Sequence, residues 1–158
     1  MEHDEIFSLL DWNQTSDNQK KGRILAQSVQ DITIFFQPLS PYGKRIWENC
    51  AKIVSQKKDD ELVPYLEKMF DWLQDYNWPG AQEIFNRLLS FSGQKILTSF
   101  LNRYHKAVDM KNEDGHMWLD NLAPLLDNDN LKKLLPSDII RTLLPYYQQP
   151  GWWYVDES

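Results

Sequence analysis

The chain has 158 residues, enough for one domain that buries a core without help from a disulfide or a metal. Hydrophobic residues make up 42% of it and aromatic residues 13%, a composition that counts against intrinsic disorder. The formal net charge of −6 counts against nucleic-acid binding, because nucleic-acid-binding proteins usually carry a basic surplus that neutralises phosphates.

The N-terminal part of the chain carries two helical patterns with weak boundaries. A short helix is predicted over residues 6–10, and Asp11-Trp12-Asn13 ends it. A longer helix is predicted over residues 16–31, because apolar side chains recur there at helical spacing. The side chains expected to face inward on the longer helix are Ile24, Leu25 and Val29.

The next segment contains a strand-like run and a helix start signal. Thr33-Ile34-Phe35-Phe36 is too short and isolated to imply a sheet. Ser40-Pro41 combines a capping hydroxyl with a proline, which predicts a helix that begins at Pro41. The apolar face of that helix is predicted to comprise Ile46, Trp47, Cys50, Ile53 and Val54.

The clearest amphipathic pattern lies in the middle of the chain. Steps of three and four residues place one apolar stripe on one helix face: Leu62, Tyr65, Leu66, Met69, Phe70 and Leu73. Asp59 or Asp60 is predicted to be the N-cap of this helix, which should end near Tyr76-Asn77 because Pro79 follows. Pro79 is then predicted to be the first residue of the following helix.

The remaining helices follow the same period. Apolar stripes are predicted at Ala81, Ile84, Phe85, Leu88 and Leu89, at Leu97, Phe100, Leu101, Tyr104 and Val108, and at Trp118, Leu119, Leu122 and Leu126. Two shorter helices are predicted, one with Leu131, Leu134 and Leu135, and a last one, capped by Ser137-Asp138, with Ile139, Ile140, Leu143 and Leu144. Pro150-Gly151 ends regular structure before an aromatic tail.

These elements predict an all-α protein in which short links make neighbouring helices antiparallel. Two Asp-aromatic-Asn triplets, at residues 11–13 and 75–77, each close one helix and precede another, and the polar segment 109–114 occupies a similar place. This spacing favours a single domain over residues 1–158, built as a solenoid of about four helix pairs. An irregular helical bundle is the alternative.

No constellation of residues predicts catalysis, a bound metal or a cofactor. His3, His105 and His116 lie far apart in sequence, and no two of them have helical ligand spacing. Cys50 lies on an apolar helix face, where a buried cysteine acts as a small hydrophobic residue. Asp71 and Asp75, four residues apart, are expected to belong to a solvated acidic face.

Two aromatic segments stand out as candidate partner-binding sites. The first is the helix-to-helix corner with Trp72, Asp75, Tyr76 and Trp78, whose aromatic rings either fill the corner or also face a partner. There, Asp75 or Asn77 is expected to cap the next helix. The second is the tail with Trp152 and Trp153, which either caps the last helix pair or forms an exposed patch.

The corner also carries a resemblance to a known family. Residues 66–81, with Trp72-Leu73-Gln74-Asp75 followed by Asn77-Trp78-Pro79, resemble the central signature of the bacterial domain-of-unknown-function family 5071. Residues 46–53 resemble the longer members of that family, and the resemblance extends over about residues 45–145. It implies a HEAT-like α–α superhelix and suits an immunity protein of a bacterial toxin system. It carries over no catalytic residue.

Taken together, these features predict a non-catalytic protein-interaction module, an immunity or adaptor protein with a basic protein or toxin as its partner. The alternatives are a small-ligand-binding or hydrolytic protein with a carboxylate-lined pocket, and a nucleic-acid-binding helical repeat with a basic groove. The single cysteine, the acidic N-terminus and the lack of an apolar run of roughly 20 residues predict a cytoplasmic protein that does not bind membranes.

Overall fold

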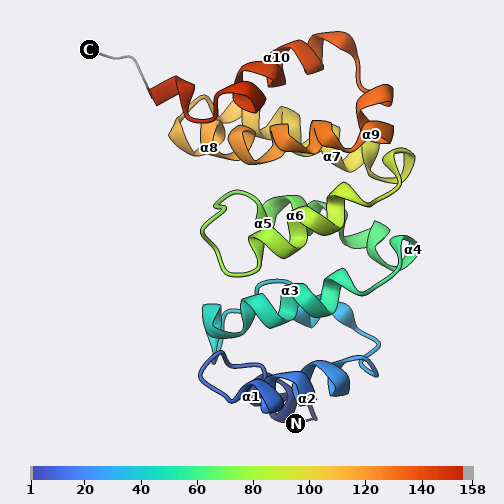
Figure 1. The fold of residues 1–158 in the computed structure, drawn as a ribbon, viewed down its shortest axis with the longest axis vertical. Coiled ribbons are helices and arrows are strands. Elements are labelled where there is room, and N and C mark those ends of the chain that lie inside the picture. Colours follow the sequence, from blue (N-terminus) through green and yellow to red (C-terminus); the bar gives the residue numbers. More distant parts are fainter. Residues whose placement is uncertain (1, 155–158) are drawn as a thin grey trace.

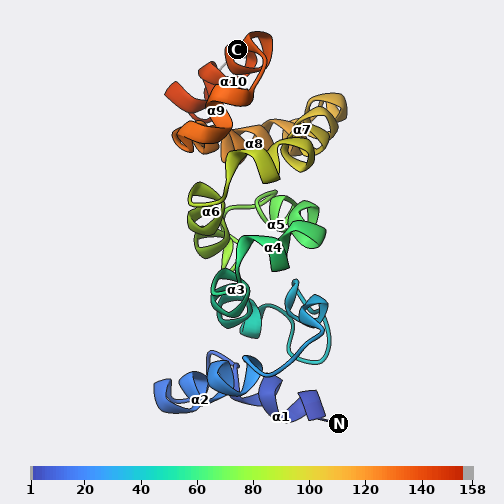
Figure 2. The same cartoon turned by 90° about the vertical axis from the view of Figure 1, so that its right-hand side faces the viewer.

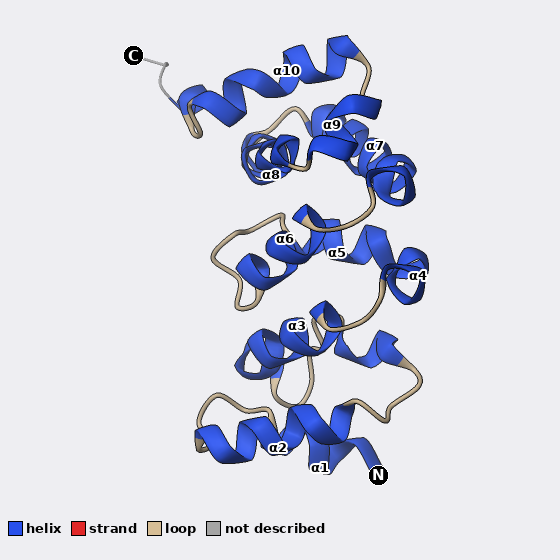
Figure 3. Cartoon of the chain, turned by 45° about the vertical axis from the view of Figure 1, so that its right-hand side comes forward, coloured by secondary structure: helices blue, strands red, loops and turns tan. Residues whose placement is uncertain are grey.

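The structure, a computed structural model, describes residues 2–154 and is all-α over that range (Figures 1 and 3). Within this range there are ten α-helices and five short 3-10 helices, and no strand. The α-helices are α1 (Glu2–Leu9), α2 (Ser16–Ala26), α3 (Trp47–Ser55), α4 (Asp59–Leu62), α5 (Leu66–Trp72), α6 (Ala81–Leu89), α7 (Gly93–Met110), α8 (Glu113–Leu122), α9 (Asp129–Leu134) and α10 (Ser137–Gln148). Across residues 2–154, no helix combines the length and the apolar character that crossing a bilayer requires.

The helices succeed one another along the long axis of the molecule, from α1 at one end to α10 at the other (Figure 1). In Figure 2, α2, α3 and α6 form one column, while α1, α4, α5 and α7 lie on the other side. Contacts run along each side, from α2 to α3 and α6 in the first column and from α5 to α7 in the second, and α9 packs on α7. One hydrophobic core therefore continues through the stack, from Ile6 to Tyr146.

The predicted apolar stripes largely form this core. All of the stripe in the middle of the chain is buried except Tyr65, which is half-buried. The five residues predicted around Cys50 are buried as well. In α7 the buried face is rotated slightly from the predicted one, toward Ile96, Phe100, Tyr104 and Ala107. In α9, Leu131 is buried and Leu134 is exposed.

The prediction for the second helix was wrong in both length and face. Helix α2 ends at Ala26, and Ile24 is 54% exposed. The buried positions are instead Gly22 and Ala26, because α1 packs very closely against α2. A Cβ atom on Gly22 would lie only 2.9 Å from the Cβ atom of Leu9, so this contact requires the smallest side chain. Leu25 is exposed, and Val29 lies beyond the helix end, half-buried against the core.

The predicted helix bounds around Pro41, Pro64 and Asp59 were also wrong. After Pro41, the chain forms a 3-10 helix from Gly43 to Ile46, and α3 begins only at Trp47. Pro64 divides the long central helix into α4, a 3-10 turn and α5, which ends at Trp72.

Helix α4 begins at Asp59, and Lys58 is its N-cap. The Asp59 carboxylate acts elsewhere: it accepts a hydrogen bond from the backbone N–H of Ser92 at 3.1 Å and pairs with Arg87 at 2.6 Å. It thereby connects α4 to the end of α6 and the start of α7. A carboxylate expected to cap its own helix instead connects successive helices of the stack.

Candidate binding sites around helix α8

The aromatic corner, residues 72–80, comprises the last residue of α5 and the turn to α6. It starts with a tight local turn, in which the Asp75 carboxylate accepts the backbone N–H of Asn77 at 2.9 Å. Asp11 accepts the N–H of Asn13 at the same distance, so the two Asp-aromatic-Asn triplets share one hydrogen bond. Neither Asp75 nor Asn77 caps α6, contrary to the prediction, because the chain continues through Pro79 and Gly80 before α6 begins at Ala81.

Gly80 lets the corner close against α3. Its φ of 88° lies in the left-handed region, which side chains other than glycine adopt at a cost. A Cβ atom on Gly80 would lie 2.7 Å from the Ala51 Cβ atom and 2.9 Å from the Trp47 carbonyl oxygen. The turn therefore depends on glycine both for its backbone conformation and for its packing.

The three large aromatic side chains of the corner have different surroundings. Trp72 is completely buried and donates its indole N–H to the Pro79 carbonyl at 3.0 Å, so its role is to close the turn. Tyr76 is 39% exposed, meets the ring of Phe85 edge to face and hydrogen-bonds Gln82. Trp78 is half-buried. The corner thus both fills the core, through Trp72, and presents aromatic surface.

Helix α8 docks directly on this corner. The indole N–H of Trp118 donates to the Phe70 carbonyl at 3.0 Å, and the side-chain amide of Asn121 donates to the Leu73 carbonyl at 2.7 Å. Both acceptors lie at the C-terminal end of α5, and the Phe70 carbonyl also accepts the backbone N–H of Leu73 at 3.0 Å. These bonds fix the register of α8 against the corner.

Because side chains three and four positions apart share a helix face, the same docking brings Asp114 and Met117 to the corner. Together with Gln74, Asp75 and Trp78 they line a hollow of about 190 Å³, which we call the corner hollow. It combines an indole ring and a thioether with two carboxylates. Neither carboxylate forms an ion pair within residues 2–154. The corner hollow is therefore a partly apolar surface with a local negative charge.

A different face of α8 holds the aromatic tail. One oxygen of the Asp120 carboxylate accepts the backbone N–H of Gly151 at 3.0 Å, and the other accepts the indole N–H of Trp153 at 2.9 Å. The Trp153 ring stacks on His116, with ring centroids 5.0 Å apart and planes at 20°. The tail up to residue 154 therefore folds back along α8, although Trp152 stays 41% exposed.

His116 is also joined to α10. Its Nδ1 atom lies 2.9 Å from the hydroxyl oxygen of Tyr146, and the two rings stack. Burial, followed by the nearby Asp120 charge, raises the pKa of Tyr146, so this hydroxyl keeps its proton at neutral pH. It can therefore donate a hydrogen bond as well as accept one.

The six residues predicted to bind a partner therefore lie in different parts of the structure. Trp72 is inside the core and cannot touch a partner, whereas Asp75 and Trp78 line the corner hollow. Tyr76 packs on α6, and Trp152 and Trp153 lie at the tail. Four residues on α8 were missed: Asp114, His116, Met117 and Asp120. Asp114 and Met117, three positions apart, share one face of the helix, and His116 and Asp120, four positions apart, share another.

The two side chains considered for catalysis, Cys50 and Asp71, are engaged in core packing and in an ion pair. Burial raises the pKa of the Cys50 thiol far above neutrality, which keeps it in the unreactive protonated form. Asp71 does not pair with Asp75; its carboxylate lies 3.0 Å from the Arg103 Nε atom and accepts a hydrogen bond from Nη2 at 3.1 Å. Burial, opposed by Arg103, raises the pKa of Asp71. Among residues 2–154, no group of three His, Cys, Asp or Glu side chains could hold a metal ion.

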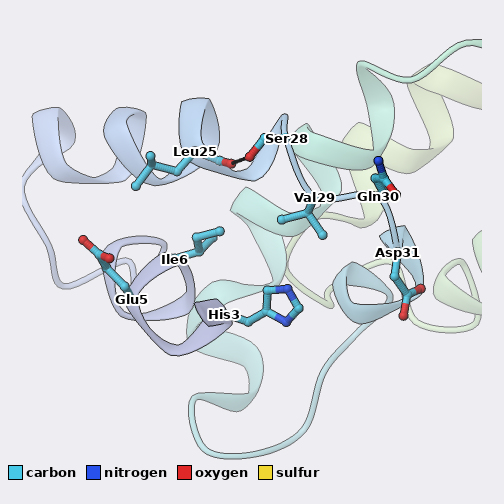
Figure 4. Close-up of a pocket in the computed structure, with 8 residues that line it drawn as sticks. All are labelled: His3, Glu5, Ile6, Leu25, Ser28, Val29, Gln30 and Asp31. Atoms are coloured by element: carbon cyan, nitrogen blue, oxygen red, sulfur yellow. Dashed lines mark hydrogen bonds between the residues drawn. The ribbon is translucent and has the colours of Figure 1, made fainter. Parts of the chain in front are cut away.

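A further hollow of about 430 Å³ lies at the N-terminal end of the stack (Figure 4). Side chains from α1, from α2 and from the link to the next 3-10 helix surround it, among them His3, Glu5 and Asp31. The Asp31 carboxylate is already used, because it accepts hydrogen bonds from the backbone and the hydroxyl of Thr33. Neither this hollow nor the corner hollow brings three acidic side chains together.

Comparison with known proteins adds a family to this description. No curated protein matches the chain, and neither does any solved structure. The family model described as "Domain of unknown function (DUF5071)" matches residues 41–133, which include the whole aromatic corner and all of α8. This match agrees with the resemblance found in the corner sequence and covers more than half of the chain, which therefore belongs to the DUF5071 family.

Proposed function

We propose that the chain is a non-catalytic protein-interaction module that binds a basic segment of a partner protein at the corner hollow. The observation that carries this proposal is the meeting of Asp75 and Asp114 beside Trp78 and Met117, contributed by elements almost forty residues apart in sequence. We interpret the stack of helices as a HEAT-like α–α superhelix of about four helix pairs. Solenoids of this kind bind partners along extended surfaces.

The chemistry of the corner hollow suits a lysine or arginine side chain. An indole face attracts a cation through its quadrupole, and more strongly where water is partly excluded. Two carboxylates beside it supply charge complementarity, which steers association and selects basic partners over acidic ones. The Met117 thioether is flexible and polarizable, so it adapts to the aliphatic stem of such a side chain. The volume of about 190 Å³ suits one side chain rather than a folded element.

The overall charge supports the same class of partner. A net charge of −6 gives long-range attraction toward a basic protein, and this attraction weakens as salt increases. An immunity or adaptor protein that binds a basic toxin in the cytoplasm fits these properties. The buried thiol of Cys50 fits a reducing compartment.

Affinity capture from the native host tests the proposal, with the wild-type chain compared with the double variant Asp75→Asn/Asp114→Asn. We expect the wild type to capture a basic protein at low salt and the variant to lose it, because both substitutions keep size but remove charge. The matched control is Asp4→Asn/Asp17→Asn, which removes two exposed carboxylates at the N-terminal end of the stack, away from the corner hollow.

The control should capture the same protein as the wild type. Equal loss of capture by both double variants would assign the effect to net charge rather than to the corner hollow. A partner that both variants retain at high salt would contradict the proposal, since a charge-dependent contact must weaken under those conditions.

A further inference from the structure

A third hollow, of about 280 Å³, lies between α7, α8 and α10, on the side of His116 that faces α7. Its inner surface is apolar: Ala107 and Leu119 are buried there, and Val108 is half-buried beside them. The rest of the lining is polar, and comprises Lys111, Asn112, His116, Thr142 and Tyr146. An apolar hollow with a few convergent polar groups is the usual form of a small-ligand site.

The charge of this hollow is opposite to that of the corner hollow. Its lining contains no carboxylate, and its one permanent charge is the Lys111 ammonium. Lys111 ends α7 with a φ of 51°, in the left-handed region, which turns the chain there toward the start of α8. The ammonium forms no ion pair within the part of the chain that the structure describes. It is therefore available to a ligand anion.

The Tyr146 hydroxyl adds a hydrogen bond that an anion can use. When His116 carries its proton on Nδ1, it donates to the Tyr146 oxygen, and the hydroxyl proton is then free for a ligand. When Nδ1 is bare, it accepts the hydroxyl proton instead. A bound carboxylate that accepts from Tyr146 selects the first arrangement.

We propose that this hollow binds a small monocarboxylate with an apolar, ring-sized body. The body lies against Ala107, Val108 and Leu119, while the carboxylate takes its charge partner from Lys111 and a hydrogen bond from Tyr146. The volume is below the range of drug-sized ligands, which limits the body to about one ring or a short alkyl chain. This site is separate from the corner hollow and does not depend on the proposed protein partner.

An NMR titration of the full chain with benzoate tests the proposal. We expect saturable shifts of the backbone amides of Ala107, Lys111 and Leu119, with a dissociation constant on the order of 1 mM for so small a ligand. Benzyl alcohol keeps the ring without the charge, and acetate keeps the charge without the ring. Both should bind about tenfold more weakly, because each lacks one of the two interactions.

Two variants test separately how the Lys111 charge and the space in the hollow contribute to benzoate binding. Lys111→Asn removes the ammonium while keeping a residue type that tolerates the left-handed conformation, and it should weaken benzoate about tenfold. Val108→Phe fills the hollow and should abolish binding without a change in charge. Lys133→Gln, on the exposed face of α9, is the matched control and should bind benzoate as the wild type does. The spectrum of each free variant shows whether its fold is kept.

Shifts that fail to saturate would overturn the proposal, as would shifts centred on other residues. Equal affinity of the wild type and Lys111→Asn for benzoate would also overturn it, because that surface variant can lose the charge without losing the fold. Unchanged binding by a folded Val108→Phe variant would place the ligand outside the hollow.

Discussion

The indole rings of Trp47 and Trp78 meet edge to face, with ring centroids 5.9 Å apart and planes at 88°. Trp47 is held in turn by a hydrogen bond from its indole N–H to the Pro38 carbonyl at 2.8 Å. Helix α3 therefore sets the orientation of Trp78, whose remaining surface lines the corner hollow. Such edge-to-face pairs contribute about 0.5–1.5 kcal/mol beyond the area they bury.

We predict that Gly80→Ala destabilises the chain by about 2–4 kcal/mol, because it combines a left-handed backbone with a close packing contact. The Cβ atom would lie 2.7 Å from the Ala51 Cβ atom, so α3 and the corner would have to separate. Urea unfolding measures the effect, and the m value should stay close to that of the wild type.

Gly43→Ala is the control for the backbone alone. Gly43 also has a left-handed φ, of 59°, but a Cβ atom there would meet nothing within 4 Å. We expect a loss of about 1–2 kcal/mol, the cost of the conformation without the clash. Equal losses for the two variants would mean that the corner does not pack as tightly as the structure shows.

The link from Asp59 to α6 and α7 should make stability depend on pH. Burial tends to raise the pKa of Asp59, but hydrogen bonds from Arg87 and the Ser92 N–H outweigh it, so the pKa is lowered in the folded chain. A lowered pKa adds stability that is present above the unfolded value of about 3.9 and is lost as the pH falls through the folded value. We predict that the free energy of unfolding of the wild type exceeds that of Asp59→Asn by about 1–2 kcal/mol at pH 7, allowing for solvent screening. This difference should shrink toward pH 3.

Asp60 supplies the comparison for this pH effect. It pairs with Lys95 at 2.6 Å, but its side chain is 84% exposed, and exposed pairs contribute little to stability. Asp60→Asn should therefore unfold almost as the wild type does at both pH values. If the stability difference between the wild type and Asp59→Asn stays constant between pH 7 and pH 3, the pH dependence does not come from Asp59.

The tail provides a prediction about local opening. Asp120 accepts both hydrogen bonds that hold the tail on α8, so Asp120→Ala should release residues 151–154 without unfolding the stack. Losing hydrogen bonds to a charged group costs about 1.5–3 kcal/mol, so amide exchange of Gly151 should accelerate at least tenfold. Asp114→Ala removes a carboxylate from another face of α8 and should leave that exchange rate unchanged. Unchanged exchange in Asp120→Ala would show that other contacts, such as the stacking on His116 and the contact of Trp152 with Tyr146, suffice to hold the tail.

Much of the fold could be predicted from the sequence because the apolar period reports directly on burial. The stripe from Leu62 to Leu73 and the residues around Cys50 are buried as their spacing indicates. Helix ends were harder, since several residues can serve as a cap and only tertiary contacts decide between them. Asp59 is the clearest case: its carboxylate binds Ser92, more than thirty residues away, rather than its own helix. Ile24 is exposed because close packing at Gly22 decides which face of α2 is buried.

The candidate site could be predicted only in part. The sequence marked Asp75, Trp78 and Trp153 through their local aromatic density. It did not show that the corner and the tail share one helix, because that depends on how Trp118 and Asn121 dock on the end of α5. Met117 and Asp120 carry no local signal beyond helical spacing, and their roles follow from this docking.

Methyl NMR of Met117 tests most directly whether the corner hollow binds a basic segment. The chain has four methionines; Met69 is completely buried in the core, and Met117 lines the hollow. In chain labelled with ¹³C-methyl methionine, with the Met117 signal identified by Met117→Leu, we predict that a tetra-arginine peptide shifts this signal saturably. Met69 should not move, a tetra-glutamate peptide should have no effect, and Asp75→Asn/Asp114→Asn should abolish the shift. A Met117 signal that stays in place, or that shifts equally in the double variant, would contradict the proposed binding site.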